Sequence, residues 1–315
     1  MKRKIKILVL LLILFLVLLL CVINLNKTEN FYNELKNIDK VGNIPKIIWS
    51  YWDTGLDNSP ELVKKSYLSW KKYNPDYRII FLDDNNLNEY IDIDFYINKI
   101  NVKKFYKEKK SDLIRCILLS EYGGIWIDSS LLLTESLDWI LEKQNNGQYN
   151  LISFYQEGFT TNEEKPVIEN WFLAVSDNNE FMKLWKDDFF FYLQVGYDKY
   201  METINDKIDI QNIGNSKYLT MHVSTQKIMT QYPHLLNKIL SIKSGTDPFY
   251  LHFKMDWDPR KFNEYICKNN NVEYVPKMIK FRGNDRKKFK NYLSKNIDDI
   301  NKIQGTIYEK YIKNL

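Results

Sequence analysis

Three ionisable side chains lie close together in the sequence and could bind a charged ligand: Asp112, Arg115 and Asp128. Two small hydroxyl residues, Ser129 and Ser130, follow Asp128 directly. A carboxylate in such surroundings suits a divalent ion that carries phosphate, because Mg²⁺ and Mn²⁺ prefer oxygen ligands and take only one or two protein carboxylates. The alternative is that Asp128 merely caps a turn. Its position alone favours neither interpretation.

The segment around these side chains predicts the elements that position them. Ser111 is suited to cap a helix, and the spacing of three puts Asp112 and Arg115 on one side of it. The two glycines at 123–124 predict the end of this helix and a tight turn. A short apolar strand then ends at Asp128, at the carboxyl edge where open α/β sheets bind their ligands.

The segments before this region predict the start of an α/β fold. Residues 44–49 and 77–82 are apolar runs typical of buried strands, and residues 60–73 carry apolar side chains at helical spacing. Strand, helix and strand joined by short loops form a βαβ unit, which predicts a mostly parallel sheet flanked by helices. Residues 151–155 predict a further strand.

The charge balance argues against a nucleic-acid-binding protein. The formal net charge is +5, but four basic residues before position 7 contribute most of it, and residues 1–23 contain no acid. A nucleic-acid binder concentrates basic residues on one face instead. Cys116 and Cys267 are most simply buried thiols, and a disulfide between them is the alternative in an oxidising compartment.

The N-terminus predicts a membrane anchor. Residues 7–23 form an uncharged apolar run behind the basic start, about long enough to cross a bilayer if Lys6 snorkels. A secretory signal peptide is the alternative, but its apolar core is shorter and ends in a small-residue cleavage site. We therefore expect one transmembrane helix over residues 1–23, a polar stalk over residues 24–43 and a folded domain beyond them. The positive charges favour a cytoplasmic N-terminus.

The order of residues from Ser111 to Asp128 is Ser-Asp-x-x-Arg-x-x-x-Leu-x-x-Tyr-Gly-Gly-Ile-Trp-Ile-Asp. It resembles the core signature of sugar transferases that carry a DxD-type motif. The nearest likeness is to the capsular polysaccharide synthesis protein family, with the Och1-like mannosyltransferases of yeast and the large clostridial toxin glucosyltransferases more distant. The opening Ile-Pro-Lys-Ile-Ile-Trp at residues 44–49 matches as well, and the resemblance extends to about residue 137.

This resemblance implies a GT-A fold, a Rossmann-like sheet over residues 44–282. Residues 44–150 would bind a nucleotide-sugar and residues 151–282 would bind the acceptor. The implied reaction moves a hexosyl group from a UDP- or GDP-sugar to a glycan acceptor in capsular or cell-surface polysaccharide synthesis, with retention of anomeric configuration. A divalent metal, Mn²⁺ or Mg²⁺, would bridge the donor's diphosphate.

The resemblance also assigns roles to residues of the central segment. Asp128 would bind the metal, Asp112 would contact the ribose or sugar of the donor, and Arg115 would contact its sugar or phosphate. The chain departs from the family's DxD pattern at Ser130, where a second carboxylate is expected. Elsewhere, Trp49 would line the nucleotide pocket, as would Tyr51, because an aromatic face can stack on a base. Asn170 would approach the donor sugar.

Two further site residues are expected late in the chain. His252 and Lys254 are two residues apart, and in an extended segment they would point to one side. By the same resemblance His252 would bind the metal and compensate for the missing second Asp. Lys254 would bind the diphosphate, for which an ammonium group is a suitable point charge.

Residues 283–315 predict an amphipathic helical tail, because their apolar residues recur mostly at spacings of three and four. We expect this tail to pack onto the domain; lying on an anionic membrane surface is the alternative. The missing second carboxylate and the aromatic content of 15% motivate a different function, a catalytically inactive, membrane-anchored carbohydrate-binding or scaffold protein. A metal-dependent hydrolase fits less well, because it would need more carboxylates. A bacterial cell membrane is the favoured location and a Golgi-type membrane the alternative.

Overall fold

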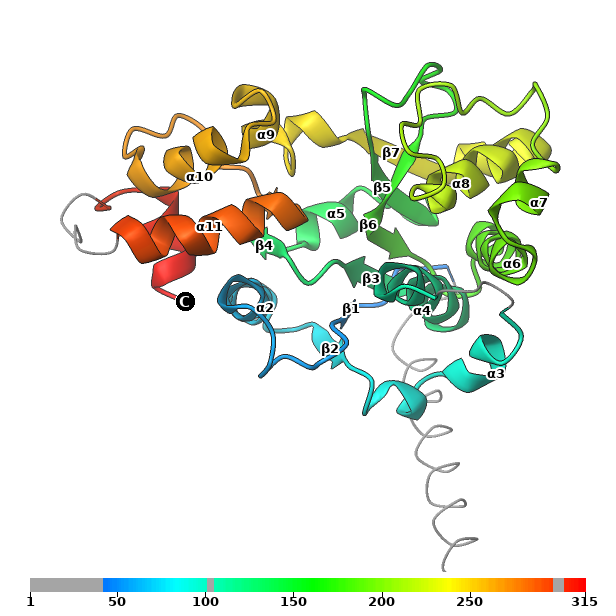
Figure 1. Ribbon diagram of the computed structural model, residues 1–315, viewed down its shortest axis with the longest axis horizontal. Coiled ribbons are helices and arrows are strands. Elements are labelled where there is room, and N and C mark those ends of the chain that lie inside the picture. The colour runs from blue at the N-terminus through cyan, green and yellow to red at the C-terminus, as the bar shows by residue number, and fades with distance from the viewer. Residues whose placement is uncertain (1–41, 101–104, 297–302) are drawn as a thin grey trace, which may run out of the picture.

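The computed structural model describes residues 42–100, 105–296 and 303–315. A six-stranded sheet forms its centre, with the strand order β2-β1-β3-β6-β5-β7 (Figure 1). β1 is parallel to β2 and β3, β5 is parallel to β7, and β6 is antiparallel to both of its neighbours. The predicted α/β class with a mostly parallel sheet is therefore confirmed. The strands are β1 (Ile47–Tyr51), β2 (Arg78–Leu82), β3 (Gly124–Ile127), β5 (Leu151–Tyr155), β6 (Ile168–Val175) and β7 (Ile239–Lys243).

Helices cover both faces of this sheet because its strands are apolar on both sides. Along β1, Ile47, Trp49 and Tyr51 face one layer of the core, and Ile48 faces the other. The first layer contains α3 (Ile93–Ile97), α4 (Lys107–Tyr122), α6 (Glu180–Val195), α7 (Tyr197–Met201) and α8 (Thr220–Gln231). The second contains α2 (Glu61–Tyr73) and α5 (Asp138–Glu142).

The predicted βαβ unit is present as β1, α2 and β2. Burial of Val63 and Trp70 fixes α2 on the sheet, and the Trp70 indole donates a 2.7 Å hydrogen bond to the carbonyl of Leu131. This contact ties the first helix to the chain that follows Asp128. The predictions for residues 60–73 and 77–82 are confirmed to within one residue.

The helix that carries Asp112 begins one turn earlier than the sequence predicts. α4 starts at Lys107, so Ser111 lies inside the helix and Tyr106 precedes its first turn. Lys and Glu are good helix formers, which explains why residues 107–110 extend the helix. The helix ends at Gly123 as predicted, with a φ of +64°, followed by Gly124 at +91°.

A second, two-stranded sheet brings the C-terminal part of the chain to the end of β3. β4 (Leu131–Leu133) pairs antiparallel with β8 (Met278–Lys280), which places Lys280 opposite Leu131. α9 (Tyr250–Lys254), α10 (Pro259–Lys268) and α11 (Gly283–Asn296) pack around this small sheet (Figure 1). α11 is the first part of the predicted tail, and residues 309–313 form a further helical turn.

The predicted membrane anchor, residues 1–23, and nearly all of the stalk lie outside the described residues. Within the described ranges, no helix combines the length and the apolar character needed to span a bilayer. Cys116 and Cys267 are both buried and free, as predicted for buried thiols, and do not form the alternative disulfide. Burial raises the pKa of the Cys267 thiol to about 12.

Candidate active site

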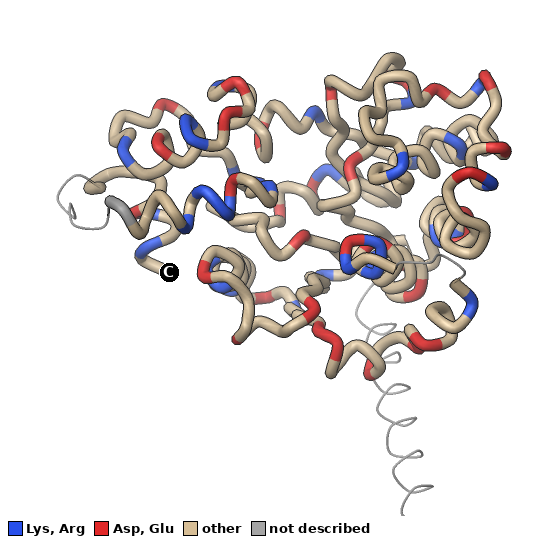
Figure 2. The backbone as a smooth tube through the Cα atoms, in the orientation of Figure 1, with Lys and Arg blue, Asp and Glu red and all other residues tan. Residues whose placement is uncertain are grey.

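A cavity of about 870 Å³ opens at the carboxyl ends of β1 and β3. Tyr51 ends β1, Asp128 follows β3, Asn170 lies on β6, and Lys280 ends β8, so four strands contribute to its wall. Arg286 on the first turns of α11 closes the same wall, and α11 carries several further basic residues (Figure 2). The cavity thus forms at the sheet edge where the sequence predicts a ligand site.

Asp128 has both carboxylate oxygens occupied. Oδ1 accepts hydrogen bonds from Arg115 Nη2 at 2.9 Å and from Trp126 Nε1 at 3.1 Å, and Oδ2 accepts one from Lys280 Nζ at 2.5 Å. Burial alone would raise the pKa of Asp128, but the charges of Lys280 and Arg115 outweigh it and hold that pKa below its usual value. The carboxylate is therefore ionised at neutral pH. It is an ion-pair partner and not a simple turn cap.

Arg115 joins the two acidic residues of the cavity floor. Its Nη1 donates to Asp112 Oδ1 at 2.6 Å, which confirms that Asp112 and Arg115 share one side of the helix. Asn170 Nδ2 donates to the same oxygen at 3.1 Å. The guanidinium carbon lies 4.7 Å from the Trp126 ring, and the Arg115 side chain is only 4% exposed. The sequence-predicted residues Asp112, Arg115, Asp128 and Asn170 thus meet at one place.

Two cations that sequence reasoning missed face this floor, Lys280 and Arg286. Arg286 Nη1 donates to Ser130 Oγ at 2.7 Å, and its guanidinium lies 5.6 Å from the ring of Trp52. Among the described residues, Arg286 forms no salt bridge to a carboxylate, whereas Lys280 is paired with Asp128. Burial lowers the pKa of Lys280, and Asp128 opposes this shift.

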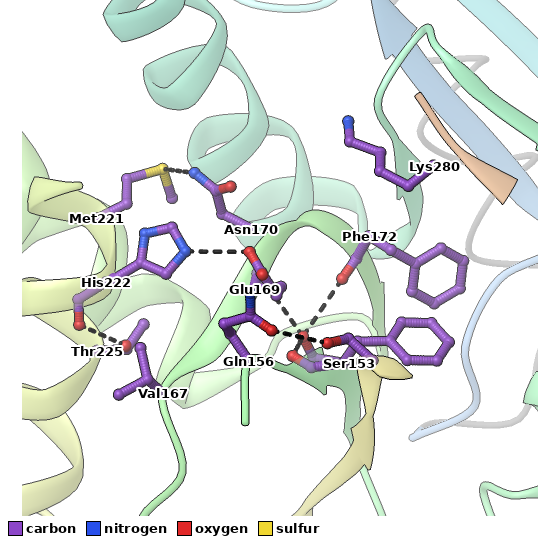
Figure 3. A network of polar contacts seen from close by, with 12 residues as sticks. Ser153, Gln156, Val167, Glu169, Asn170, Phe172, Met221, His222, Thr225 and Lys280 are labelled. Carbon is purple, nitrogen blue, oxygen red and sulfur yellow. Dashed lines mark hydrogen bonds and ion pairs between the residues drawn. The ribbon is translucent and has the colours of Figure 1, made fainter. Parts of the chain in front are cut away.

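The opposite wall of the cavity carries a buried acid–base pair. Glu169 Oε2 lies 3.2 Å from Nε2 of His222, and both side chains are buried (Figure 3). Nδ1 of His222 has no hydrogen-bond partner within the described residues. Asn170 contacts the sulfur of Met221 at 3.3 Å, which links this wall to the floor. In Figure 3, Lys280 lies across Asn170 from His222.

The two aromatic residues predicted for the nucleotide pocket have different positions. Tyr51 is the last residue of β1, lines the cavity and donates a hydrogen bond to Asp84. Trp49 lies deeper in the sheet, fully buried, and its indole donates to the carbonyl of Gly123 at 2.9 Å. The prediction that Trp49 lines the pocket is therefore wrong, because only the end of the strand reaches the cavity. Trp52, the next residue after β1, lines the cavity in its place and is partly exposed.

The expectation that His252 and Lys254 point to one side is also wrong. Both belong to helix α9, where residues two apart point to different sides. His252 is fully buried, and its Nε2 lies 2.9 Å from Asp285 Oδ2. Burial lowers the pKa of His252, and hydrogen bonding to Asp285 opposes this shift. Lys254 is exposed and contacts the hydroxyl of Tyr265, so neither residue lines the cavity.

The residues around Asp128 do not fit a divalent metal. Its two oxygens already serve Arg115 and Lys280, and the missing second carboxylate is Ser130, whose hydroxyl is held by Arg286. In the part of the chain that the structure describes, no three His, Cys, Asp or Glu side chains are grouped to hold a metal. A dication bound to Asp128 would lie near the ammonium group of Lys280. At a separation of about 4 Å and an effective dielectric constant of about 20, the repulsion between them would be roughly 8 kcal/mol.

The sequence offered a weak signal for the two missed cations. Lys280 follows a short apolar run, the same pattern that pointed to Asp128, but no motif surrounds it. Arg286 belongs to the basic stretch at residues 282–288, which leads into the predicted amphipathic tail and shows no spacing that would single out one residue as a ligand contact. Lys280 and Asp128 become neighbours only through the antiparallel pairing of β4 with β8.

Comparison with known sequences agrees with the motif. The profile described as capsular polysaccharide synthesis protein matches residues 22–243, more than half of the chain. A glycosyltransferase, afumC, of Aspergillus fumigatus is 28% identical over 155 residues, which are 45% of this chain and 39% of that protein. The initiation-specific alpha-1,6-mannosyltransferase of Saccharomyces cerevisiae is 25% identical over 161 residues, 46% of this chain and 33% of that protein. The chain thus aligns with less than two-fifths of the length of each of these relatives.

Solved structures of glycosyltransferases resemble the chain at low identity. The galactosyltransferase LgtC, solved with donor and acceptor sugar analogs, has 13% identity and a TM-score of 0.41, covering 79% of this chain and 95% of LgtC. The glycosyltransferase GlyE of Streptococcus pneumoniae has 12% identity and a TM-score of 0.42, covering 79% of this chain and 60% of GlyE.

Proposed function

The chain belongs to the capsular polysaccharide synthesis protein family, and from that premise we propose that it is a glycosyltransferase of GT-A architecture. It transfers a hexosyl group from a nucleotide-diphosphate sugar, a UDP- or GDP-sugar, to a glycan acceptor. The single observation that carries the proposal is the ion-pair cluster of Asp112, Arg115, Asp128 and Lys280 on the floor of the cavity. Buried charges of both signs in a ligand-sized cavity are typical of a functional site.

The proposed donor lies across this cluster. Asp112, Arg115 and Asn170 supply the hydrogen-bonding groups that hold a sugar, with the Arg115 guanidinium 2.6 Å and the Asn170 amide 3.1 Å from the same Asp112 oxygen. Tyr51 and Trp52 at the end of β1 offer an aromatic surface for the nucleobase. The assignment keeps five residues predicted from the sequence, replaces Trp49 by Trp52 and leaves out His252 and Lys254.

The proposed reaction breaks the bond between the anomeric carbon and the diphosphate oxygen, and forms a bond from that carbon to an acceptor hydroxyl oxygen. The electron pair of the broken bond stays on the diphosphate oxygen, which departs with an additional negative charge, and the proton of the acceptor hydroxyl passes to water. Retention of configuration follows from the family resemblance and is part of the proposal. The same resemblance predicts dependence on a divalent metal. The two cations bound to Asp128, Arg115 and Lys280, make a metal at this position unfavourable.

We place the protein at a membrane, with residues 1–23 as a single N-terminal anchor and residues 24–43 as a stalk. The apolar run at residues 7–23 supports this placement. A bacterial cell membrane is favoured over a Golgi-type membrane. The proposed role is the synthesis of capsular or other cell-surface polysaccharide, and the glycan acceptor would bind near the Glu169–His222 wall.

Transfer assays with purified protein and a panel of nucleotide-sugars test the activity. Asp128→Asn keeps the shape of the side chain but removes the charge that Arg115 and Lys280 share, so we expect transfer to fall by about 100-fold or more. Asp256→Asn changes an exposed carboxylate and should leave transfer unchanged. Far-UV circular dichroism checks that both variants are folded. Full transfer activity in Asp128→Asn would show that Asp128 is not part of the active site.

A second candidate function is a catalytically inactive carbohydrate-binding or scaffold protein. The observation that favours it is the replacement of a second carboxylate by Ser130, together with the ion pairs that Asp128 forms with Arg115 and Lys280. Calorimetry separates the two functions. Binding of a nucleoside diphosphate supports the enzyme, whereas binding of glycans without any nucleoside diphosphate supports the scaffold.

A further inference from the structure

The family resemblance assigns metal ligands to three positions of this chain, and the side chains at all three positions contact other protein groups instead. Asp128 is bound by Lys280, Ser130 stands in place of the second carboxylate and is bound by Arg286, and His252 is directed to Asp285. Asp285 is held in turn by Arg282 through Nε at 2.9 Å. Ser130 and His252 therefore supply no metal ligand beside Asp128.

The fold holds the two cations firmly in this place. Lys280 lies opposite Leu131 in the pairing of β4 with β8, and the Leu131 amide donates to the Asp128 carbonyl at 2.9 Å. The short turn between β3 and β4 therefore sets the distance from Asp128 to Lys280. Arg286 is held by its hydrogen bond to the Ser130 hydroxyl, which in turn donates to the Phe281 carbonyl at 2.9 Å.

The cations keep hydrogen-bonding capacity for a ligand. An ammonium group has three donors, and the described contacts of Lys280 use only one of them, for Asp128. Arg286 has five donors, and its described hydrogen bonds to the Ser130 hydroxyl and the Phe281 carbonyl both use Nη1. Charge-assisted hydrogen bonds from such groups are the ordinary means of binding phosphate.

The charge of the cluster suits an anion and not another cation. The cluster of Asp112, Arg115, Asp128 and Lys280 is formally neutral, and Arg286 beside it raises the formal sum of these five groups to +1. A bound dication would raise this sum to +3 next to the buried cations Arg115 and Lys280, which is unfavourable. The diphosphate of a nucleotide-sugar would lower it instead.

We infer that Lys280 and Arg286 bind the diphosphate of the donor and stabilise it as it leaves, in the role that a divalent metal has in DxD-type transferases. The inference rests on the proposed function. It makes the reaction metal-independent: when the bond to the anomeric carbon breaks, the new negative charge on the diphosphate is met by Nζ of Lys280 and the guanidinium of Arg286.

Calorimetric binding of UDP, GDP, ADP, CDP and dTDP to the full chain tests this inference, in EDTA and again with Mn²⁺. We expect one of these nucleotides to bind with affinities that agree within about twofold in the two buffers. Lys280→Gln and Arg286→Gln should each weaken this binding by about tenfold or more, the effect of one charge-assisted hydrogen bond. The matched control is Lys254→Gln, which removes an exposed ammonium group and should bind within about twofold of the wild type.

The outcomes are distinguishable. Binding or transfer that requires Mn²⁺ overturns the inference and leaves the proposed function intact, as does wild-type affinity in both Lys280→Gln and Arg286→Gln. If no nucleoside diphosphate binds in either buffer and no sugar is transferred, the proposed function and the inference both fail. Because Arg286 is only partly buried, we expect Arg286→Gln to fold. It therefore tests the inference even if Lys280→Gln does not fold.

Discussion

At the scale of single residues, Arg115 connects the two carboxylates of the cavity floor. One nitrogen serves Asp112 and the other serves Asp128, while the guanidinium plane lies near Trp126. A lysine keeps the charge but has no planar fork and cannot stack in the same way. We therefore expect Arg115→Lys to lower the free energy of unfolding by about 1–3 kcal/mol, measured by urea denaturation.

The control for this change is Arg260→Lys on the exposed side of α10, which should alter stability by less than about 0.5 kcal/mol. An Arg115→Lys protein as stable as the wild type would show that the two hydrogen bonds and the contact with Trp126 contribute nothing that an ammonium group cannot replace.

At the scale of elements, the turn from α4 into β3 depends on Gly124. Its φ is +91°, and a Cβ atom there would lie 2.9 Å from the carbonyl oxygen of Ile47 on the neighbouring strand. Gly124→Ala therefore adds a backbone clash to the strain of a positive φ. We expect it to lower the free energy of unfolding by about 2 kcal/mol or more in thermal or urea unfolding. Gly147→Ala is the matched control, because Gly147 has a φ of +85° but no atom within 4 Å of an added Cβ.

The difference in unfolding free energy between Gly124→Ala and Gly147→Ala isolates the cost of the backbone clash, because both variants carry the strain of a positive φ. Equal destabilisation of the two proteins would mean that β1 and β3 can separate locally at no cost, contrary to the close pairing of Ile48 with Ile125.

Elements formed by local patterns were predictable from the sequence, and contacts between distant segments were not. The helix, the glycine turn and the strand before Asp128 follow from spacing within about twenty residues. Lys280 lies about 150 residues away and reaches Asp128 through one strand pairing, for which the sequence carries no periodic signal. The segment Tyr250–Lys254 has only five residues, too few for the spacing of its side chains to distinguish a helix from a strand.

At the scale of the whole molecule, a buried cluster of His252, Arg282 and Asp285 joins α9 to the start of α11 and makes stability depend on pH. Burial would raise the pKa of Asp285, but His252 and Arg282 outweigh it and lower that pKa to about 2. Burial lowers the pKa of His252 as well. In both cases the unfolded chain binds more protons in acid than the folded chain, so the free energy of unfolding falls as the pH falls.

We expect two windows in this loss of stability. The His252 contribution is complete above about pH 6.5 and is lost below it, and the Asp285 contribution is complete above about pH 4 and is lost as the pH falls through about 2. The second window amounts to about 2 kcal/mol. Urea denaturation between pH 7 and pH 3 measures the slope. Asp285→Asn should flatten the part below pH 4 and Asp206→Asn, at an exposed position, should not. A slope below pH 4 that is the same in all three proteins would show that Asp285 ionises alike in the folded and the unfolded chain, and that its charge does not help to hold α11 against α9.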